Sequence, residues 1–175
     1  NLGSGTDTLT LANGTNAVTV SNVETVTGDS GADTVTLGTT ITAGVVNLGD
    51  GSDRLVLANG TNTVTSVNVE TITGGTGNDT VTLTDVANTL TASGIETLTG
   101  GTAADTVTLT AAVTGATVDL GAGSDALTLS SAGANSLTAT GIETLVGGSA
   151  AATVTLGAAL TGAPINLGAG PDSLR

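Results

Sequence analysis

One motif recurs from one end of the chain to the other, and it limits the possible folds more than any other feature. "NLGSGTDTLTLANGTN" at residue 1 returns as "NLGDGSDRLVLANGTN" at residue 47, and related copies begin at residues 119 and 166. Between them lie versions of "VETITGGTGNDTVTL", which itself starts at residue 69. Every copy closes on one equivalent position, occupied in turn by Asp7, Asp33, Asp53, Asp79, Asp105, Asp125, Ala152 and Asp172. These positions lie 20 to 27 residues apart, a spacing typical of the coils of a solenoid.

Each repeat contains short runs in which aliphatic and threonine residues alternate, separated by turns rich in glycine and asparagine. Such alternation predicts strands with one buried face, here at residues 8–12, 17–22 and 24–27 of the first long repeat. The predicted fold class is all-β: a parallel β-solenoid, of the β-helix or β-roll type, with about seven coils of roughly 20–27 residues and about three short strands per coil. Residues 1–175 are expected to form a single repeat array, an excerpt or a subunit of a longer assembly.

The composition fits a thin aliphatic interior and argues against catalysis. The chain has no aromatic residue, no Cys and no His, and its two basic residues are Arg54 and Arg175. Acid–base chemistry would therefore depend on carboxylates in equivalent positions of a repeat, so an enzyme is not expected. The net charge of −13 argues against nucleic acid as a partner and favours cations. No apolar run reaches the roughly 18 residues that span a bilayer, so no membrane insertion is expected.

The stretch "GGTGNDTVT" resembles the nonapeptide of the repeats-in-toxin, or hemolysin-type calcium-binding, family. The match is carried by Gly74, Gly75, Gly77, Asp79 and Val81. The resemblance implies that the loops bind Ca²⁺ through Asp carboxylates and backbone carbonyls, in a parallel β-roll. It also implies a bacterial protein that leaves the cell by type I secretion and acts extracellularly or at the cell surface. The chain departs from the family pattern by having one such loop per predicted coil, and by Ala103, Ala150 and Ala152 in three motif positions.

The candidate metal-binding residues follow from this resemblance and from charge. Aligned coils would stack the acidic corners about 5 Å apart, where like charges repel, and Ca²⁺ accepts six to eight oxygen ligands. The alternative is that each Asp caps its turn by accepting backbone N–H groups, while Gly supplies positive φ. The candidate residues are Asp7, Asp33, Asp53, Gly74, Gly75, Gly77, Asp79, Asp105, Asp125 and Asp172.

A second acidic series, Glu24, Glu70, Glu96 and Glu143, recurs in the long repeats. Because each Glu has the same place in its own repeat, a solvated position at a strand edge is expected rather than an active site. Outward Thr-x-Thr pairs also recur, and are expected to form one flat rank. They lie at Thr8/Thr10, Thr34/Thr36, Thr80/Thr82, Thr106/Thr108 and Thr153/Thr155.

These observations predict a structural extracellular repeat protein, such as a surface-layer component, an adhesin stalk or a fibre subunit. Ca²⁺ would make its coils rigid, and its partners would be further copies stacked end to end, neighbouring repeats or divalent cations. The alternative is a binding module that recognises ice or cell-surface polysaccharide through a threonine face.

Overall fold

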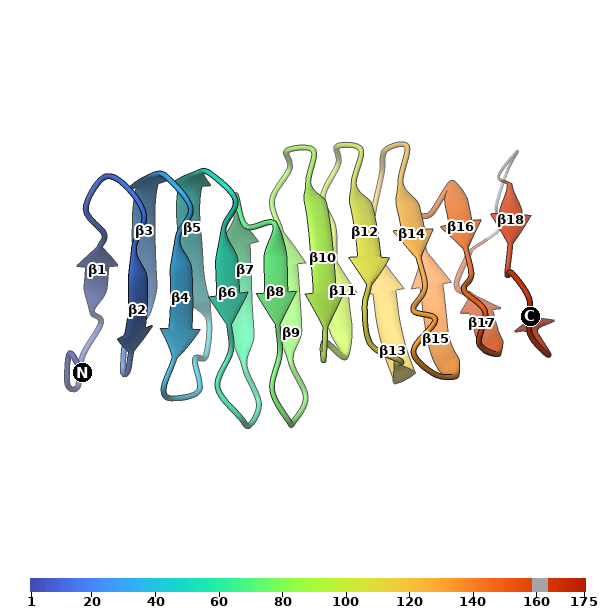
Figure 1. Cartoon of the computed structure of the whole chain (residues 1–175), viewed down its shortest axis with the longest axis horizontal. Helices are drawn as coiled ribbons and strands as arrows, with labels where there is room; N and C mark the ends of the chain where they lie inside the picture. The colour runs from blue at the N-terminus through green and yellow to red at the C-terminus, as the bar shows by residue number, and fades with distance from the viewer. Residues whose placement is uncertain (159–163) are drawn as a thin grey trace.

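The computed structural model describes residues 1–158 and 164–175, and it confirms the parallel β-solenoid (Figure 1). The strands form two sheets, in which each strand pairs in parallel with the strand two places along the chain. The odd-numbered sheet contains β1 (Thr8–Thr10), β3 (Thr25–Ser30), β5 (Gly44–Asp50), β7 (Thr63–Val67), β9 (Thr80–Leu83), β11 (Thr97–Thr99), β13 (Thr114–Asp119), β15 (Asn135–Thr140), β17 (Ala152–Leu156) and β19 (Ser173–Leu174). The even-numbered sheet contains β2 (Ala17–Val20), β4 (Thr34–Leu37), β6 (Arg54–Val56), β8 (Thr71–Thr73), β10 (Thr89–Ser93), β12 (Thr106–Leu109), β14 (Ala126–Thr128), β16 (Thr144–Val146) and β18 (Ile165–Asn166).

The prediction of three strands per coil is wrong, because each coil has two strands, one in each sheet. Thr8 pairs with Thr25, and Thr25 pairs with Val45, so one coil takes about 17 or 20 residues. Coils are therefore shorter and more numerous than predicted. The error has a physical cause: Asn22 has a φ of 53° and turns the chain back toward the odd-numbered sheet. The segment predicted as the third strand of the first coil is thus β3, the first strand of the second coil.

Aliphatic side chains fill the space between the two sheets. The largest fully buried side chains include Leu48, Leu55, Ile72 and Leu127, each with no exposed surface. Each contributes roughly 2 kcal/mol by burial. Among the aliphatic residues of the alternating runs, Val35, Leu37, Ile41 and Val46 are buried, whereas Leu9, Leu11 and Val18 of the first coil are only partly buried.

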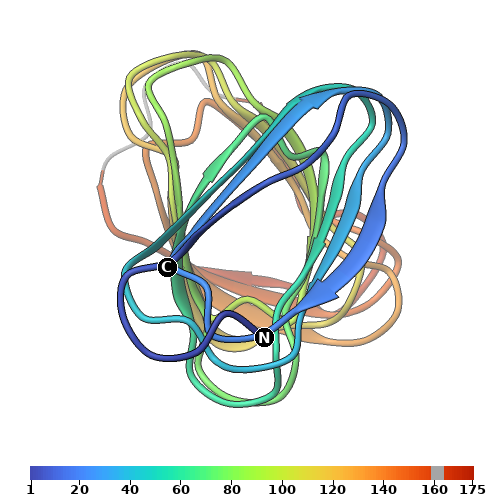
Figure 2. The same cartoon turned by 90° about the vertical axis from the view of Figure 1, so that its left-hand side faces the viewer.

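The view from the side of the N-terminus shows the coils as stacked loops that rotate along the array (Figure 2). This rotation is the twist expected of β-sheets. No helix that could cross a bilayer occurs in the part of the chain that the structure describes.

Candidate functional site

The aspartates that recur in the repeats lie at two different corners of the coil. Asp7, Asp79 and Asp172 directly precede odd-numbered strands, whereas the others directly precede even-numbered strands, namely Asp33, Asp53, Asp105 and Asp125. The prediction that these residues form one column of equivalent corners is therefore wrong. A step of 26 residues, as from Asp7 to Asp33, is about one and a half coils, so it moves the motif to the opposite corner.

At each corner, acidic side chains cross-link consecutive coils through the backbone. The N–H of Asn16 donates to Oδ1 of Asp33 (2.8 Å), the N–H of Asp33 donates to Oδ1 of Asp53 (2.7 Å), and the N–H of Asp53 donates to Oε2 of Glu70 (2.6 Å). We call this arrangement the carboxylate ladder. Its bonds always run from the N–H of one coil to the side chain of the following coil.

The same ladder recurs farther along the even-numbered corner and at the odd-numbered corner. Three bonds repeat the sequence Asn–Asp–Asp–Glu, from Asn88 to Asp105 (2.9 Å), Asp105 to Asp125 (2.6 Å) and Asp125 to Glu143 (2.8 Å). At the odd-numbered corner the bonds join Asp7 to Glu24 (2.8 Å), Asn62 to Asp79 (3.0 Å), Asp79 to Glu96 (2.8 Å) and Ala152 to Asp172 (2.8 Å).

The four glutamates are ladder members, so the prediction that they are merely solvated is wrong. Each is partly buried and places Oε2 on the backbone N–H of an Asp in the preceding coil. Like the ladder aspartates, each Glu directly precedes its strand.

The asparagines of the ladder were not predicted to take part. Asn16, Asn62 and Asn88 each donate a second bond, from Nδ2, to the same Asp Oδ1 that accepts their backbone N–H, at 2.8, 2.7 and 2.8 Å. A sequence signal for this role exists. Asn16 and Asn88 are 72 residues apart, as are Asp33 and Asp105, so the polar residues of the ladder repeat with a period of four coils.

The glycines of the calcium-like motif give room first to the backbone of the following coil and then to the carboxylates. The atoms nearest to a Cβ on Gly28, Gly74 or Gly100 would be the carbonyl oxygens of Leu48, Gly94 or Leu120, respectively. A Cβ on Gly28, Gly74 or Gly100 would lie 2.8 Å from Oδ2 of Asp33, Asp79 or Asp105, respectively. The N–H of Gly75 donates to Oδ2 of Asp79 (3.2 Å). Gly77 has a φ of 125° and packs against the backbone of Gly60. Thus Gly74 and Gly75 contact the carboxylate of Asp79, whereas Gly77 shapes the turn.

The second carboxylate oxygen is often buried without a hydrogen-bond partner among the described residues, as in Asp7, Asp33, Asp53, Asp105 and Asp125. Burial raises the pKa of Asp53 above its ordinary value. The N–H of Asp33 opposes this shift, and the charges of Glu70 and Asp33 add to it. The pKa of Asp125 is raised in the same way, by burial first and by the charges of Glu143 and Asp105.

The surroundings of Oδ1 in three of these carboxylates differ from the calcium geometry that the family resemblance implies. The groups that converge on Oδ1 of Asp33, Asp79 and Asp105 are N–H donors, whereas Ca²⁺ requires oxygen ligands. Within residues 1–158 and 164–175, no three His, Cys, Asp or Glu residues are grouped to hold a metal. Calcium binding by the candidate residues remains a prediction.

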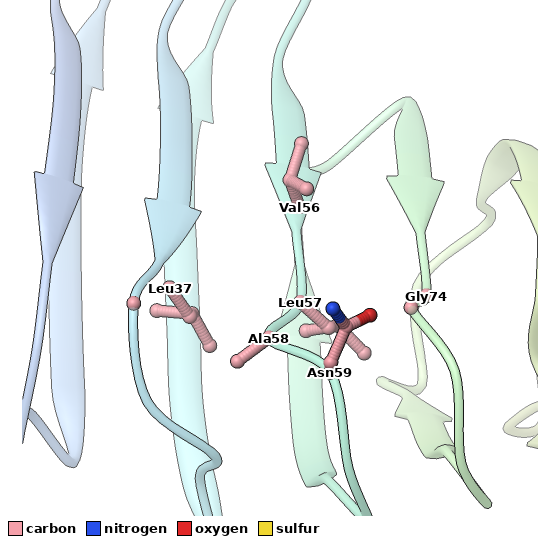
Figure 3. A pocket seen from close by; sticks show the side chains of 8 residues that line it. Leu37, Val56, Leu57, Ala58, Asn59 and Gly74 are labelled. Carbon is pink, nitrogen blue, oxygen red and sulfur yellow. The ribbon is translucent and has the colours of Figure 1, made fainter.

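A surface hollow of about 460 Å³ lies beside the ends of β4, β6 and β8 (Figure 3). Its lining includes Leu37, Leu57, Ala58, Asn59 and Gly74. No carboxylate lines the hollow, so it includes Gly74 and Gly75 of the calcium-like motif but not Asp79.

Threonines line both sheets in register, rather than forming the single rank predicted. The pairs Thr8/Thr10, Thr80/Thr82 and Thr153/Thr155 lie on the odd-numbered sheet, and Thr34/Thr36 and Thr106/Thr108 lie on the even-numbered sheet. The longest row crosses the odd-numbered sheet through Thr63, Thr80, Thr97, Thr117, Thr138 and Thr155.

Comparison with protein-family models, curated proteins and solved structures finds no match for this chain. The interpretation of its function therefore depends on the geometry of the array itself.

Proposed function

We propose that this chain is a structural repeat protein of the bacterial cell surface, a rigid segment of an adhesin stalk, a surface layer or a fibre. One observation carries the proposal: the carboxylate ladder uses the acidic corner residues to join one coil to the next. Asp33, Asp53, Asp79, Asp105 and Asp125 are at most 1% exposed, so their side chains are committed to the interior. The extracellular location and type I secretion follow the family resemblance and belong to the same proposal.

The ladder is expected to make the rod rigid. Backbone pairing along both sheets and side-chain bonds at both corners resist separation of neighbouring coils, because each side-chain hydrogen bond contributes about 1 kcal/mol. The array is thus suited to transmit force along its long axis.

The partner in this proposal is a further coil of the same kind, from a second copy or from neighbouring repeats. Among the described strands, β1 and β19 each pair on one side only, and unpaired strand edges favour association. Each ladder bond runs from a backbone N–H to a side chain of the following coil. The carboxylate of Asp7 could therefore accept an N–H from a coil stacked before it, and a coil stacked after Asp172 would supply an acceptor for the N–H of Asp172. Residues 1–9 and 166–174 also share one motif. Stacking is therefore head to tail.

Electron microscopy and light scattering of the isolated 175-residue chain test this function. We expect straight filaments whose length increases with protein concentration. Replacing Thr8 and Leu174, exposed residues on the two edge strands, by Lys should leave monomers with an unchanged circular dichroism spectrum. Monomers of the parent chain at every concentration would reject self-stacking, and a flexible shape in small-angle scattering would reject the rigid rod.

The threonine rows favour a second candidate, a binding module for ice or surface polysaccharide. Neighbouring threonines in a row are about 4.8 Å apart, the strand spacing of a sheet, which gives a regular array of hydroxyl and methyl groups. Thermal hysteresis of the parent chain, lost in Thr97→Lys on the odd-numbered sheet but kept in Thr108→Lys on the even-numbered sheet, would support ice binding. Absence of hysteresis and of polysaccharide binding would remove this candidate.

A further inference from the structure

We propose that the carboxylate ladder takes the place of a bound cation, so that the array folds and remains folded without divalent metal ions. This inference concerns what holds the coils together, and it is independent of whether the rods stack end to end. It replaces the calcium-binding role predicted from the motif at Gly74–Asp79.

The first step is the number and type of groups at Oδ1. In three places, one Asp oxygen accepts both the backbone N–H and the side-chain amide of an Asn in the preceding coil, at distances of 2.7 to 3.0 Å. The pairs are Asn16–Asp33, Asn62–Asp79 and Asn88–Asp105. Two N–H dipoles thus already provide the positive potential that a cation would supply.

The second step is that the asparagine amide has a fixed orientation. Nδ2 of Asn62 also donates to the carbonyls of Ala58 (2.8 Å) and Gly60 (3.0 Å). Turning the amide so that its oxygen could bind a metal would break these bonds and leave buried carbonyls without a donor, which is costly. The same arrangement holds Asn16 and Asn88.

The third step concerns the Gly-rich loop. In the best match to the calcium motif, Gly75 presents its N–H to Oδ2 of Asp79 (3.2 Å), and Gly74 lies close to the same oxygen. A loop that directs an N–H toward the carboxylate stabilises the anion directly, whereas a calcium loop must direct carbonyl oxygens toward the ion.

The fourth step limits the electrostatic reason to expect a cation, because like charges meet only within groups of three acidic residues. At the even-numbered corner, the order of residues is Asn16, Asp33, Asp53, Glu70 and then Asn88. A neutral Asn therefore separates each group of three acidic residues from the next. The carboxylates do not form the continuous charged column on which the calcium prediction depended.

The experiment compares thermal unfolding of the 175-residue chain, followed by far-UV circular dichroism, in three solutions of equal ionic strength. One contains EGTA and no divalent ion, one contains MgCl2, and one contains CaCl2 at about 5 mM, above the roughly 0.1–1 mM dissociation constants of extracellular calcium modules. We expect the same folded spectrum and the same midpoint in all three. A chain that is unfolded in EGTA, or a midpoint raised in CaCl2 alone by about 2 °C or more, the shift that a single site of this affinity would give, would overturn the proposal.

Variants of Asp79, all measured in EGTA, test whether its carboxylate acts as a hydrogen-bond acceptor rather than as a metal ligand. Asp79→Asn keeps an acceptor for both donors of Asn62 and should lower the midpoint less than Asp79→Ala, which removes the acceptor. Asp50→Asn, at an exposed acidic residue, serves as the control and should not change the midpoint. Equal midpoints for parent, Asp79→Asn and Asp79→Ala would overturn the proposal, even if microscopy still shows rods.

Discussion

Positive φ values recur at equivalent positions in the two halves of the chain, but different residue types adopt them. Asn22, Ala43 and Asn68 have positive φ values of 53°, 57° and 49°, and glycines occupy the corresponding positions one four-coil period later. Those glycines are Gly94, Gly115 and Gly141, with φ values of 62°, 69° and 59°. Asn tolerates this region, but Ala has no side-chain hydrogen bond to offset the strain.

Ala43→Gly is therefore expected to stabilise the protein by about 1 kcal/mol, because glycine adopts this φ without strain. The converse change, Gly115→Ala, should destabilise it by a similar amount. A Cβ at Gly115 would meet no atom within 4 Å, so that effect would come from the backbone alone. Urea unfolding of both variants measures these changes, and shifts of the same sign would contradict this explanation.

The pKa values of Asp53 and Asp125 predict a pH dependence at the residue scale. Burial raises both pKa values above 3.8, so the folded chain holds these protons at a pH where the unfolded chain has lost them. Their ionisation therefore reduces stability at neutral pH, and stability is regained as the pH falls through the folded pKa toward about 4. The double variant Asp53→Asn/Asp125→Asn should show a smaller gain than the parent chain.

Thermal midpoints between pH 7 and pH 4 provide the measurement. The matched control is Asp29→Asn/Asp50→Asn, which changes the net charge equally at exposed positions. If the control flattens the pH profile as much as the buried pair does, general charge repulsion explains the profile and the assignment to Asp53 and Asp125 is wrong.

At the scale of elements, the ladder lacks one carboxylate between β15 and β17. Ala152 occupies the position of Asp33, Asp79 and Asp105, directly after a coil that presents Asn135. Asn135 is 2% exposed. Its Nδ2 donates to the carbonyls of Ser130 (2.8 Å) and Gly133 (3.1 Å), but among the described residues it has no carboxylate acceptor like the one that Asp79 gives Asn62. Gly147 remains in the position of Gly28, Gly74 and Gly100, and a Cβ there would meet the backbone of Leu167.

Ala152→Asp should offer Nδ2 of Asn135 a carboxylate acceptor, because the backbone N–H of Asn135 already donates to the carbonyl of Ala151 (2.8 Å). It should raise stability by about 1 kcal/mol, which is the net value of a typical hydrogen bond. In a chain of this size that corresponds to a midpoint about 2–4 °C higher. Ala151→Asp, one residue earlier and outside the ladder position, is the control. An equal rise in both variants, or a fall in Ala152→Asp alone, would show that the missing carboxylate is not what this coil lacks.

At the scale of the whole molecule, the ladder and the strands repeat every four coils. Glu24 and Glu96 are 72 residues apart, and each directly precedes a strand of the odd-numbered sheet, β3 or β11. Since each coil contacts only its neighbours, removal of a whole period should leave the remaining coils in register.

Deletion of residues 25–96, which joins Glu24 to Thr97, is expected to give a folded, shorter rod. Four coils at about 4.8 Å each reduce its length by about 19 Å, which small-angle scattering can measure. Deletion of residues 25–97 joins Glu24 to Leu98 and turns the following side chains to the opposite face, so its unfolding midpoint should be much lower. Equal stability of the two deletions would contradict the four-coil period.

The sequence predicted much of this fold because the relevant signals are local. Alternation at Thr34 to Leu37 indicates which side chains face inward, and the repeat length indicates a solenoid. The candidate aspartates were also found from their repetition. The ladder was not, because its bonds join residues about 17 or 20 positions apart, such as Asn16 with Asp33 and Asp33 with Asp53.

The sequence by itself therefore determined the repeat, the aliphatic interior, and the acidic and glycine-rich corners. Only the tertiary structure decided that two strands complete a coil, that the corners form two columns, and that N–H groups surround the carboxylates. The physical reason is that side-chain alternation specifies a face, whereas coil closure depends on where a turn returns the chain. That return is fixed by hydrogen bonds to the preceding coil, and local sequence does not contain them.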